Sequence, residues 1–217
     1  MATLNLSHGL DAHSTVLCIG AHCDDIEIGC GGTLVRWARE YPGTKFVWAI
    51  FAVEVNREAE SRLAASRLLA GAGGYETRFF DFRASYFPAQ VESIKDRFEQ
   101  LKSAVRPDVI LTHYLHDRHQ DHKVLSELTW NTWRSHLILE YEIPKYEGDL
   151  GHPNFFVPLR AADLARKVET LMECFPSQHT RRWFTPDTFS ALARLRGVEC
   201  DAPDKYAEAF HARKICV

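Results

Sequence analysis

The sequence lacks the features that would mark a membrane or secreted protein. Its longest apolar run, FVWAIFAV at residues 46–53, has eight residues, whereas about 20 are needed to span a bilayer. The first 15 residues contain neither a basic segment followed by an apolar stretch nor a small-residue cleavage site. We therefore expect a cytoplasmic protein that does not insert into membranes.

Paired cysteines and a charge excess are missing as well. The six cysteines form no C-x-x-C pair, so they indicate neither a zinc ribbon nor a disulfide framework, and we expect most of them to be reduced core residues. The formal net charge is only −3, and such a balance gives no basic surface for nucleic acid or anionic lipid. We expect no nucleic-acid partner.

What is present is an ordinary globular composition with a regular order of elements. The 217 residues are 46% hydrophobic and 25% charged, which favours one domain over residues 1–217. Apolar runs predict strands, and helical periodicity between them predicts helices. The expected strands are 16–21, 45–53, 75–82 and 107–113, and the expected helices are 33–40, 57–72 and 90–105. This alternation predicts an α/β fold with a parallel sheet, helices on both faces, and a ligand site outside the carboxyl ends of the strands.

The pattern loosens after residue 137. The stretch 137–159 shows no clear periodicity, and helical patterns return at 162–174 and 185–196. The loosened stretch has two interpretations, a wall of the substrate pocket or a plain surface excursion.

A first cluster of polar residues follows the first expected strand, in AHCDDIEIGCGG at residues 21–32. One aspartate could cap a helix after a glycine-rich turn. A second adjacent carboxylate, however, costs free energy unless a cation lies nearby, and His22 would give that cation a nitrogen ligand beside Asp24 and Asp25. On this stretch alone, a capped turn and a metal site both remain open.

The glycines of this stretch also invite a dinucleotide-binding interpretation. The required spacing is G-x-G-x-x-G or Ala, and the run from Gly29 to Leu34 fails at its last position. Asp24, Asp25 and Glu27 would also repel a pyrophosphate. We therefore set nucleotide redox chemistry aside.

A second cluster, HYLHDRHQDHKVL at residues 113–125, follows a later strand. Its histidines recur every third residue, and such a row drifts around a helix, so the four of them cannot all meet one ion. Carboxyl ends of parallel strands share one edge of a sheet, so both polar clusters should meet there. This juxtaposition favours the metal site over the capped turn.

The two clusters together resemble the LmbE or PIG-L family of zinc-dependent de-N-acetylases. The stretch A-H-C-D-D-I-E matches the family's A-H-P-D-D-x-E, and H-Q-D-H matches H-x-D-H. The segments REAE (57–60) and RLRGVECDAPDKYAEAF (194–210) are also similar to family segments. The resemblance implies a Rossmann-like, mostly parallel sheet and an enzyme that removes acetyl groups from N-acetylated amino sugars or their conjugates.

The resemblance also implies a ligand set and a base. His22, Asp25 and His122 correspond to the zinc ligands, which leave an open position for water. Fe²⁺ can replace zinc in such sites. Asp24 corresponds to the general base, which agrees with the divergence of adjacent side chains: one aspartate can ligate while the other faces the water.

Three further residues receive roles from the resemblance. His119 corresponds to the histidine that, when protonated, stabilises the developing oxyanion or protonates the leaving amine, and Asp121 to the carboxylate that orients it. Arg57 corresponds to the arginine that hydrogen-bonds the sugar; its alternative is a helix-surface ion pair with Glu60.

One position departs from the family pattern, because Cys23 stands where the motif usually has proline. We expect its thiol to point away from the metal, since neighbouring residues in an extended loop point in opposite directions. His113 and His116 are expected to be structural or pocket-lining.

Three functions remain in view at this stage. The favoured one is deacetylation of a small-molecule amino sugar, the second is hydrolysis of another amide or an ester, and the third is a silent carbohydrate-binding module. Retention of Asp24 and His119 argues against the third. Whether the chain forms a homo-oligomer is left open.

Overall fold

A computed structural model of the chain describes residues 13–54 and 57–215. The polar N-terminal residues up to residue 12 therefore lie outside the described residues. Within them the elements are β1 (Thr15–Gly20), α1 (Asp25–Glu40), β2 (Lys45–Ile50), α2 (Arg57–Leu68), β3 (Gly74–Phe79), α3 (Val91–Ala104), β4 (Val109–His113), α4 (Gln120–Thr132), β5 (Leu137–Tyr141), β6 (Phe155–Leu159), α5 (Ala161–Cys174), α6 (Pro186–Glu199) and β7 (Tyr206–Ala212).

The strands form one sheet in the order β3-β2-β1-β4-β5-β7-β6. Strands β3, β2, β1, β4 and β5 are parallel, and β7 runs antiparallel to both β5 and β6. The Rossmann-like, mostly parallel α/β fold expected from the sequence is therefore confirmed. Crossover helices between parallel strands explain the alternating order along the chain.

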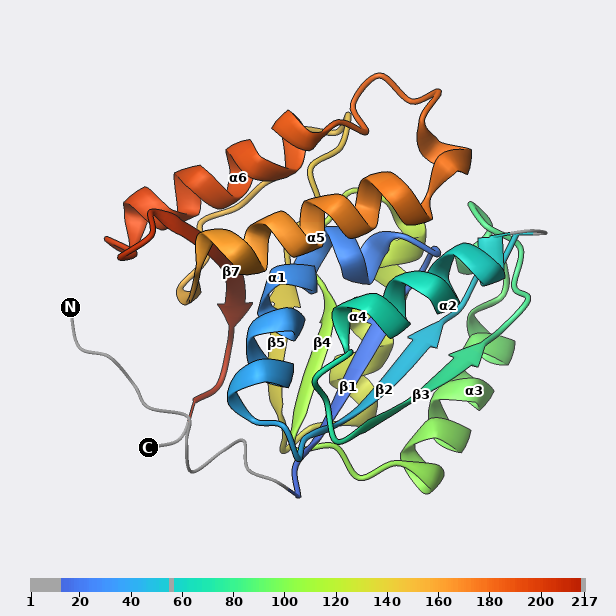
Figure 1. Cartoon of the computed structure of the whole chain (residues 1–217). Coiled ribbons are helices and arrows are strands. Elements are labelled where there is room, and N and C mark those ends of the chain that lie inside the picture. The colour runs from blue at the N-terminus through green and yellow to red at the C-terminus, as the bar shows by residue number, and fades with distance from the viewer. Residues whose placement is uncertain (1–12, 55–56, 216–217) are drawn as a thin grey trace.

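Helices cover both faces of the sheet (Figure 1). One face carries α1, α2 and α5, with α6 packed against α5 and β7, and the other carries α3 and α4. Strand β1 shows why both faces are apolar: Val16 and Cys18 belong to one core cluster, and Leu17 and Ile19 to the other. Alternate residues of a strand point to opposite faces, so a strand covered on both sides is apolar throughout.

The structure differs from the sequence expectation in two places. Helix α1 begins at Asp25 rather than at Thr33, so the glycines lie inside the helix and not in a turn before it. The loosened stretch 137–159 contains β5 and β6, and β7 follows near the C-terminus. Proline at position 158 weakened the strand signal of β6, which is an edge strand where proline is tolerated.

Two composition-based expectations can also be compared with the structure. The cysteines at 18, 23, 30, 174 and 200 are free thiols, and all but Cys200 are buried. None of the helices within residues 13–54 and 57–215 combines the length and the apolar character that crossing a bilayer requires.

Candidate metal centre and active site

The two polar clusters meet at the point where the strand order reverses. From β1 the chain proceeds outward to β2 and β3 and then returns to β4, which pairs with β1 on its other side. Ligands of such open sheets bind in the crevice at this switch point, outside the carboxyl ends of the strands. His22 and Asp25 follow β1, and His119 and His122 follow β4 at the start of α4.

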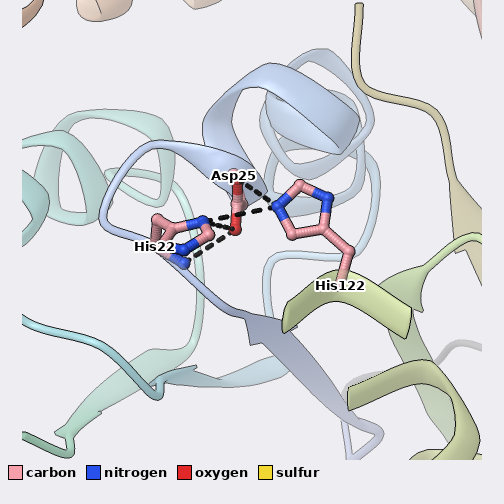
Figure 2. A group of neighbouring side chains, drawn as sticks. All are labelled: His22, Asp25 and His122. Carbon is pink, nitrogen blue, oxygen red and sulfur yellow. Dashed lines mark hydrogen bonds and ion pairs between the residues drawn. The ribbon is translucent and has the colours of Figure 1, made fainter. Parts of the chain in front are cut away.

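Three of these side chains converge closely enough to hold one metal ion. Figure 2 shows His22 and Asp25 opposite His122, which projects from α4. Nδ1 of His22 lies 3.4 Å from Oδ2 of Asp25, and Nε2 of His122 lies 3.5 Å from Oδ1 of Asp25. The two ring nitrogens are 3.3 Å apart. Two imidazole nitrogens and a carboxylate oxygen form a donor set that suits Zn²⁺ and Fe²⁺.

In His22 and His122, the ring nitrogen that points away from Asp25, here called the outer nitrogen, faces a second carboxylate. Nε2 of His22 lies 3.1 Å from Oδ2 of Asp121, and Nδ1 of His122 lies 2.9 Å from Oδ2 of Asp117. A carboxylate at the outer nitrogen keeps the ring proton there and leaves a lone pair on the inner nitrogen. The inner nitrogens are the two that face Asp25, so the residues present fit a divalent cation.

The charges around these residues also favour a cation. Burial lowers the pKa of His22, but the carboxylates of Asp25 and Asp121 outweigh it and raise the pKa to about 10. Burial raises the pKa of Asp25, but the surrounding imidazoles of His122, His113 and His22 outweigh it and hold this pKa well below its usual range. The buried carboxylates therefore stabilise positive charge where the ligand atoms converge, either as a proton on His22 or as a metal ion that displaces this proton from Nδ1.

Asp24 is placed differently from its neighbour Asp25. It occupies the N-cap position of α1 but makes no side-chain capping hydrogen bond, so helix capping does not explain it. Its Oδ2 lies 3.1 Å from Nη2 of Arg57, and the side chain is 9% exposed. Burial raises the pKa of Asp24 and the neighbouring Asp25 raises it further, although the Arg57 guanidinium acts in the opposite direction. The pair of aspartates therefore offers one carboxylate to the ligand cluster and a second, separately held carboxylate beside it.

Arg57 begins α2 and contacts two carboxylates. Besides Asp24 it reaches Glu60, with Nε 3.7 Å from Oε2, and its side chain is only 11% exposed. The ion pair with Glu60 that we considered as an alternative is therefore present. It coexists with the contact to Asp24, which places the guanidinium beside the candidate base.

His119 lies against the two candidate histidine ligands. It is the N-cap residue of α4, and its Nδ1 accepts a hydrogen bond from the Asp121 amide at 3.3 Å. Its ring stacks on that of His122 with centroids 4.4 Å apart and meets the ring of His22 edge-on at 5.0 Å. Burial lowers the pKa of His119, and the nearby His122 lowers it further.

The carboxylate of Asp121 does not take the partner that the resemblance implied. It contacts His22, as described, and accepts hydrogen bonds from the amides of Ser85 at 2.5 Å and Phe87 at 3.1 Å. His119 contacts the backbone amide of Asp121 instead. In this geometry the carboxylate orients His22, because α4 begins here and directs the side chain of Asp121 toward the segment before α3.

The segment of the chain that contains these site residues is similar in sequence to known proteins. The sequence profile of the PIG-L family, described as GlcNAc-PI de-N-acetylase, matches residues 17–133, more than half of the chain. The chain belongs to the PIG-L family. The uncharacterized deacetylase YaiS of Escherichia coli (strain K12) is 30% identical over 142 residues, which cover 59% of this chain and 74% of YaiS. The family is metal-dependent, and the N-deacetylase class of enzyme expected from the sequence is confirmed.

Solved structures share the PIG-L fold of this chain at low sequence identity. N,N'-diacetylchitobiose deacetylase from Pyrococcus horikoshii, complexed with its inhibitor MPG, has a TM-score of 0.71 at 19% identity and covers 92% of this chain and 84% of its own. GalB, the 4-carboxy-2-hydroxymuconate hydratase from Pseudomonas putida KT2440, has a TM-score of 0.71 at 17% identity. The match covers 94% of this chain and 98% of the GalB chain. A deacetylase and a hydratase both have this fold, so the likeness establishes the fold alone.

Two groups around the PIG-L site were not assigned from the sequence. Asp117 lies five residues before His122, whose outer nitrogen it binds, and its place in the histidine-rich segment was a usable signal. Ser85 has a positive φ of 65° and donates its amide to Asp121 from 36 residues away in the chain. Nothing in the local sequence indicated this contact.

The departure from the PIG-L motif, Cys23, lies apart from the ligand atoms. Its side chain is fully buried, and its Sγ lies 3.9 Å from the carbonyl oxygen of Ala52. Burial raises the pKa of this thiol to about 12. The thiol points to a backbone carbonyl, and its raised pKa disfavours the thiolate form in which cysteine binds metals.

The two further histidines of the second cluster differ in burial. His113 is buried, its Nε2 accepts a hydrogen bond from the Ala21 amide at 2.9 Å, and its ring stacks on His122 at 3.9 Å. His116 is exposed and meets the ring of Tyr114 edge-on at 5.3 Å. The contacts of His113 tie the end of β4 to the loop that follows β1.

Proposed function

We propose that this chain is a metal-dependent hydrolase that removes the N-acetyl group from an amino sugar or an amino-sugar conjugate. The observation that carries the proposal is the different placement of two adjacent aspartates. Asp25 belongs to the candidate ligand set, whereas Asp24 is held beside it by Arg57. A site that only binds metal or sugar needs no second buried carboxylate, but a hydrolase needs a base at this position.

The proposed metal is Zn²⁺, with Fe²⁺ as a substitute. His22 through Nδ1, Asp25 through its carboxylate and His122 through Nε2 would hold it, and three protein ligands leave a position open. A divalent ion supplies Lewis acidity at this position, which polarises a carbonyl group and lowers the pKa of water. The chain's own residues then supply the proton transfers and the hydrogen bonds.

Asp24 is the proposed general base. Its carboxylate takes a proton from the water that attacks the acetamide carbonyl carbon, and the same proton then passes to the leaving nitrogen as the C–N bond breaks. The products are the free amine and acetic acid, which releases its remaining proton to become acetate. Arg57, 3.1 Å away, keeps the carboxylate turned toward the substrate.

His119 is proposed to stabilise the oxyanion. Its Nδ1 accepts a hydrogen bond from the Asp121 amide, so the neutral ring carries its proton on Nε2. That N–H can donate to the carbonyl oxygen as negative charge develops on it. Burial lowers the pKa of His119, which favours the neutral ring over the protonated ring that the family resemblance implied.

The substrate class is inferred from Arg57 and from the relatives. The guanidinium lies beside the candidate base and has donors for sugar hydroxyl groups. The family's description names a GlcNAc conjugate, and the name of the Pyrococcus horikoshii enzyme contains a disaccharide of acetylated amino sugars. We therefore infer a substrate that carries an N-acetylglucosamine unit.

Acetate release tests this proposal directly. The protein loaded with Zn²⁺ or Fe²⁺ is incubated with N-acetylglucosamine and its conjugates, with simple N-acetyl amides, and with acyl esters. We expect acetate from at least one amino-sugar substrate and little from the simple amides and esters. Equal or faster hydrolysis of simple amides or esters would favour the alternative, a metal-dependent hydrolase of other acyl compounds. No hydrolysis of any of them by metal-loaded protein would contradict both.

A further inference from the structure

Glycine residues interrupt the apolar sequence of α1 close to the candidate ligands. Gly29, Gly31 and Gly32 lie inside this helix, although glycine weakens a helix interior. A Cβ at position 29 would lie 2.2 Å from the ring of Tyr141, and one at position 32 would lie 2.5 Å from Leu159. Glycine is therefore required here, because other segments pack directly onto the backbone of α1.

Two charged side chains from the C-terminal part of the chain use this access to bind the helix backbone. The carboxylate of Glu208, on β7, accepts hydrogen bonds from the amides of Gly32 at 2.9 Å and Thr33 at 2.6 Å. The ammonium of Lys167, on α5, donates to the carbonyl of Ile28 at 2.7 Å. The ammonium and the carboxylate also bind each other at 2.6 Å.

This ion pair contacts the two backbone groups that an ordinary helix hydrogen bond joins. In a regular α-helix the amide of residue 32 donates to the carbonyl of residue 28. Here the carbonyl has an ammonium partner and the amide has a carboxylate partner. The pair therefore restrains the first turns of α1 relative to the rest of the helix.

The helical turn that this ion pair restrains carries the candidate ligand Asp25 and the candidate base Asp24. The amide of Ile28 donates to the carbonyl of Asp24 at 3.0 Å, so the carbonyl that Lys167 holds belongs to the same helical turn as Asp24 and Asp25. Both members of the pair are only 5% exposed, so water competes little for these contacts.

We propose that Lys167 and Glu208 are positioning residues, which fix the first turn of α1 so that Asp24 and Asp25 keep the geometry for metal binding and proton transfer. This inference rests on the proposed metal-dependent function. It gives residues outside the matched range 17–133 a role in a site whose candidate ligands all lie within that range.

Three variants test the role of the pair: Lys167→Met, Glu208→Gln, and both together. The measurements are the dissociation constant for Zn²⁺, by competition with a chelator, and the melting temperature of the metal-free protein. Each single variant leaves a buried charge unpaired and should lower both stability and affinity. The double variant leaves no unpaired charge, so its melting temperature should recover toward that of the wild type, while its Zn²⁺ affinity stays at least about tenfold weaker because the Ile28 carbonyl has lost its donor. If neither single variant folds, the double variant alone decides the question.

A matched control removes an ion pair that joins α1 to α5 at the other end of α1. Arg39, in the last turn of α1, binds Asp163 of α5 at 2.9 Å, at the end of α1 far from the ligands. Arg39→Met should leave the Zn²⁺ affinity within about twofold of the wild type, because it does not touch the first turn.

The outcomes separate this inference from the proposed function. Wild-type Zn²⁺ affinity in the double variant, or an equal loss in Arg39→Met, would overturn the positioning role while leaving the metal site in place. A wild-type protein that binds no Zn²⁺ would overturn the proposed function, and the positioning role with it.

Discussion

Asp117→Asn is the substitution whose effect on the metal site can be worked out most fully. Oδ2 of Asp117 lies 2.9 Å from Nδ1 of His122 and 2.9 Å from Nζ of Lys145, and its Oδ1 accepts the His119 amide at 2.7 Å. Asparagine has one oxygen. If that oxygen stays on the His119 amide, the new NH₂ group faces an ammonium and a ring N–H. His122 must then accept at Nδ1 and carry its proton on Nε2, the atom that faces Asp25.

A protonated Nε2 cannot give a lone pair to a metal ion. Loss of the hydrogen-bond partner of a ligating histidine weakens metal binding by about 10- to 100-fold, which is about 1.4 to 2.8 kcal/mol. Folding should weaken as well, because the side chains of Asp117 and His122 are each only 3% exposed and a charged hydrogen bond is worth about 1.5–3 kcal/mol. Metal affinity and stability must therefore be measured together.

The assay is chelator competition for Zn²⁺, with thermal unfolding to verify that the variant is folded. The control is Asp149→Asn, because Asp149 also binds Lys145 at 2.7 Å and accepts the Arg118 amide at 2.6 Å. We expect the control to keep Zn²⁺ affinity within about twofold, since its partners are not candidate ligands. Wild-type affinity in folded Asp117→Asn, or an equal loss in the control, would refute the tautomer argument.

Three further predictions concern the remaining site residues. His22→Ala and His122→Ala should each lose most of the metal by elemental analysis, because each removes one of three protein ligands; full metal content in either would remove that residue from the ligand set. His119→Ala should keep its metal while acetate release slows by roughly 10²- to 10³-fold, and turnover close to that of the wild type would exclude it from the mechanism. Cys23→Ala should retain metal and acetate release, because the Sγ lies near the Ala52 carbonyl at 3.9 Å and not at the ligand atoms; loss of metal would instead make Cys23 a ligand.

The placement of the ligand-bearing segments was predictable because it follows from topology. His22 and His122 each come shortly after a buried strand, and parallel strands bring their carboxyl ends to one edge. The divergence of Asp24 and Asp25 follows from their adjacency at a helix start. These features need only the local sequence and the strand order, and the structure brings His22, Asp25 and His122 together as expected.

The contacts that support the site were not predictable, because they join segments far apart in the chain. The family resemblance implied that the Asp121 carboxylate orients His119, yet this carboxylate binds the amides of Ser85 and Phe87. In the sequence, the glycines of α1 indicated a turn. They are required inside the helix because Tyr141 and Glu208, from distant parts of the chain, pack onto the helix backbone. Local propensity cannot reveal partners of this kind.

The central claim is that adjacent aspartates hold the metal and move the proton separately, and a side-by-side comparison of Asp24→Asn and Asp25→Asn tests it most directly. Metal content and acetate release are measured for both variants and for the wild type. We predict that Asp25→Asn loses most of its metal, whereas Asp24→Asn keeps it and releases acetate roughly 10²-fold or more slowly, the usual effect of removing a positioned base. Equal metal content in the two variants, or near-normal acetate release by metal-loaded Asp24→Asn, would contradict the account.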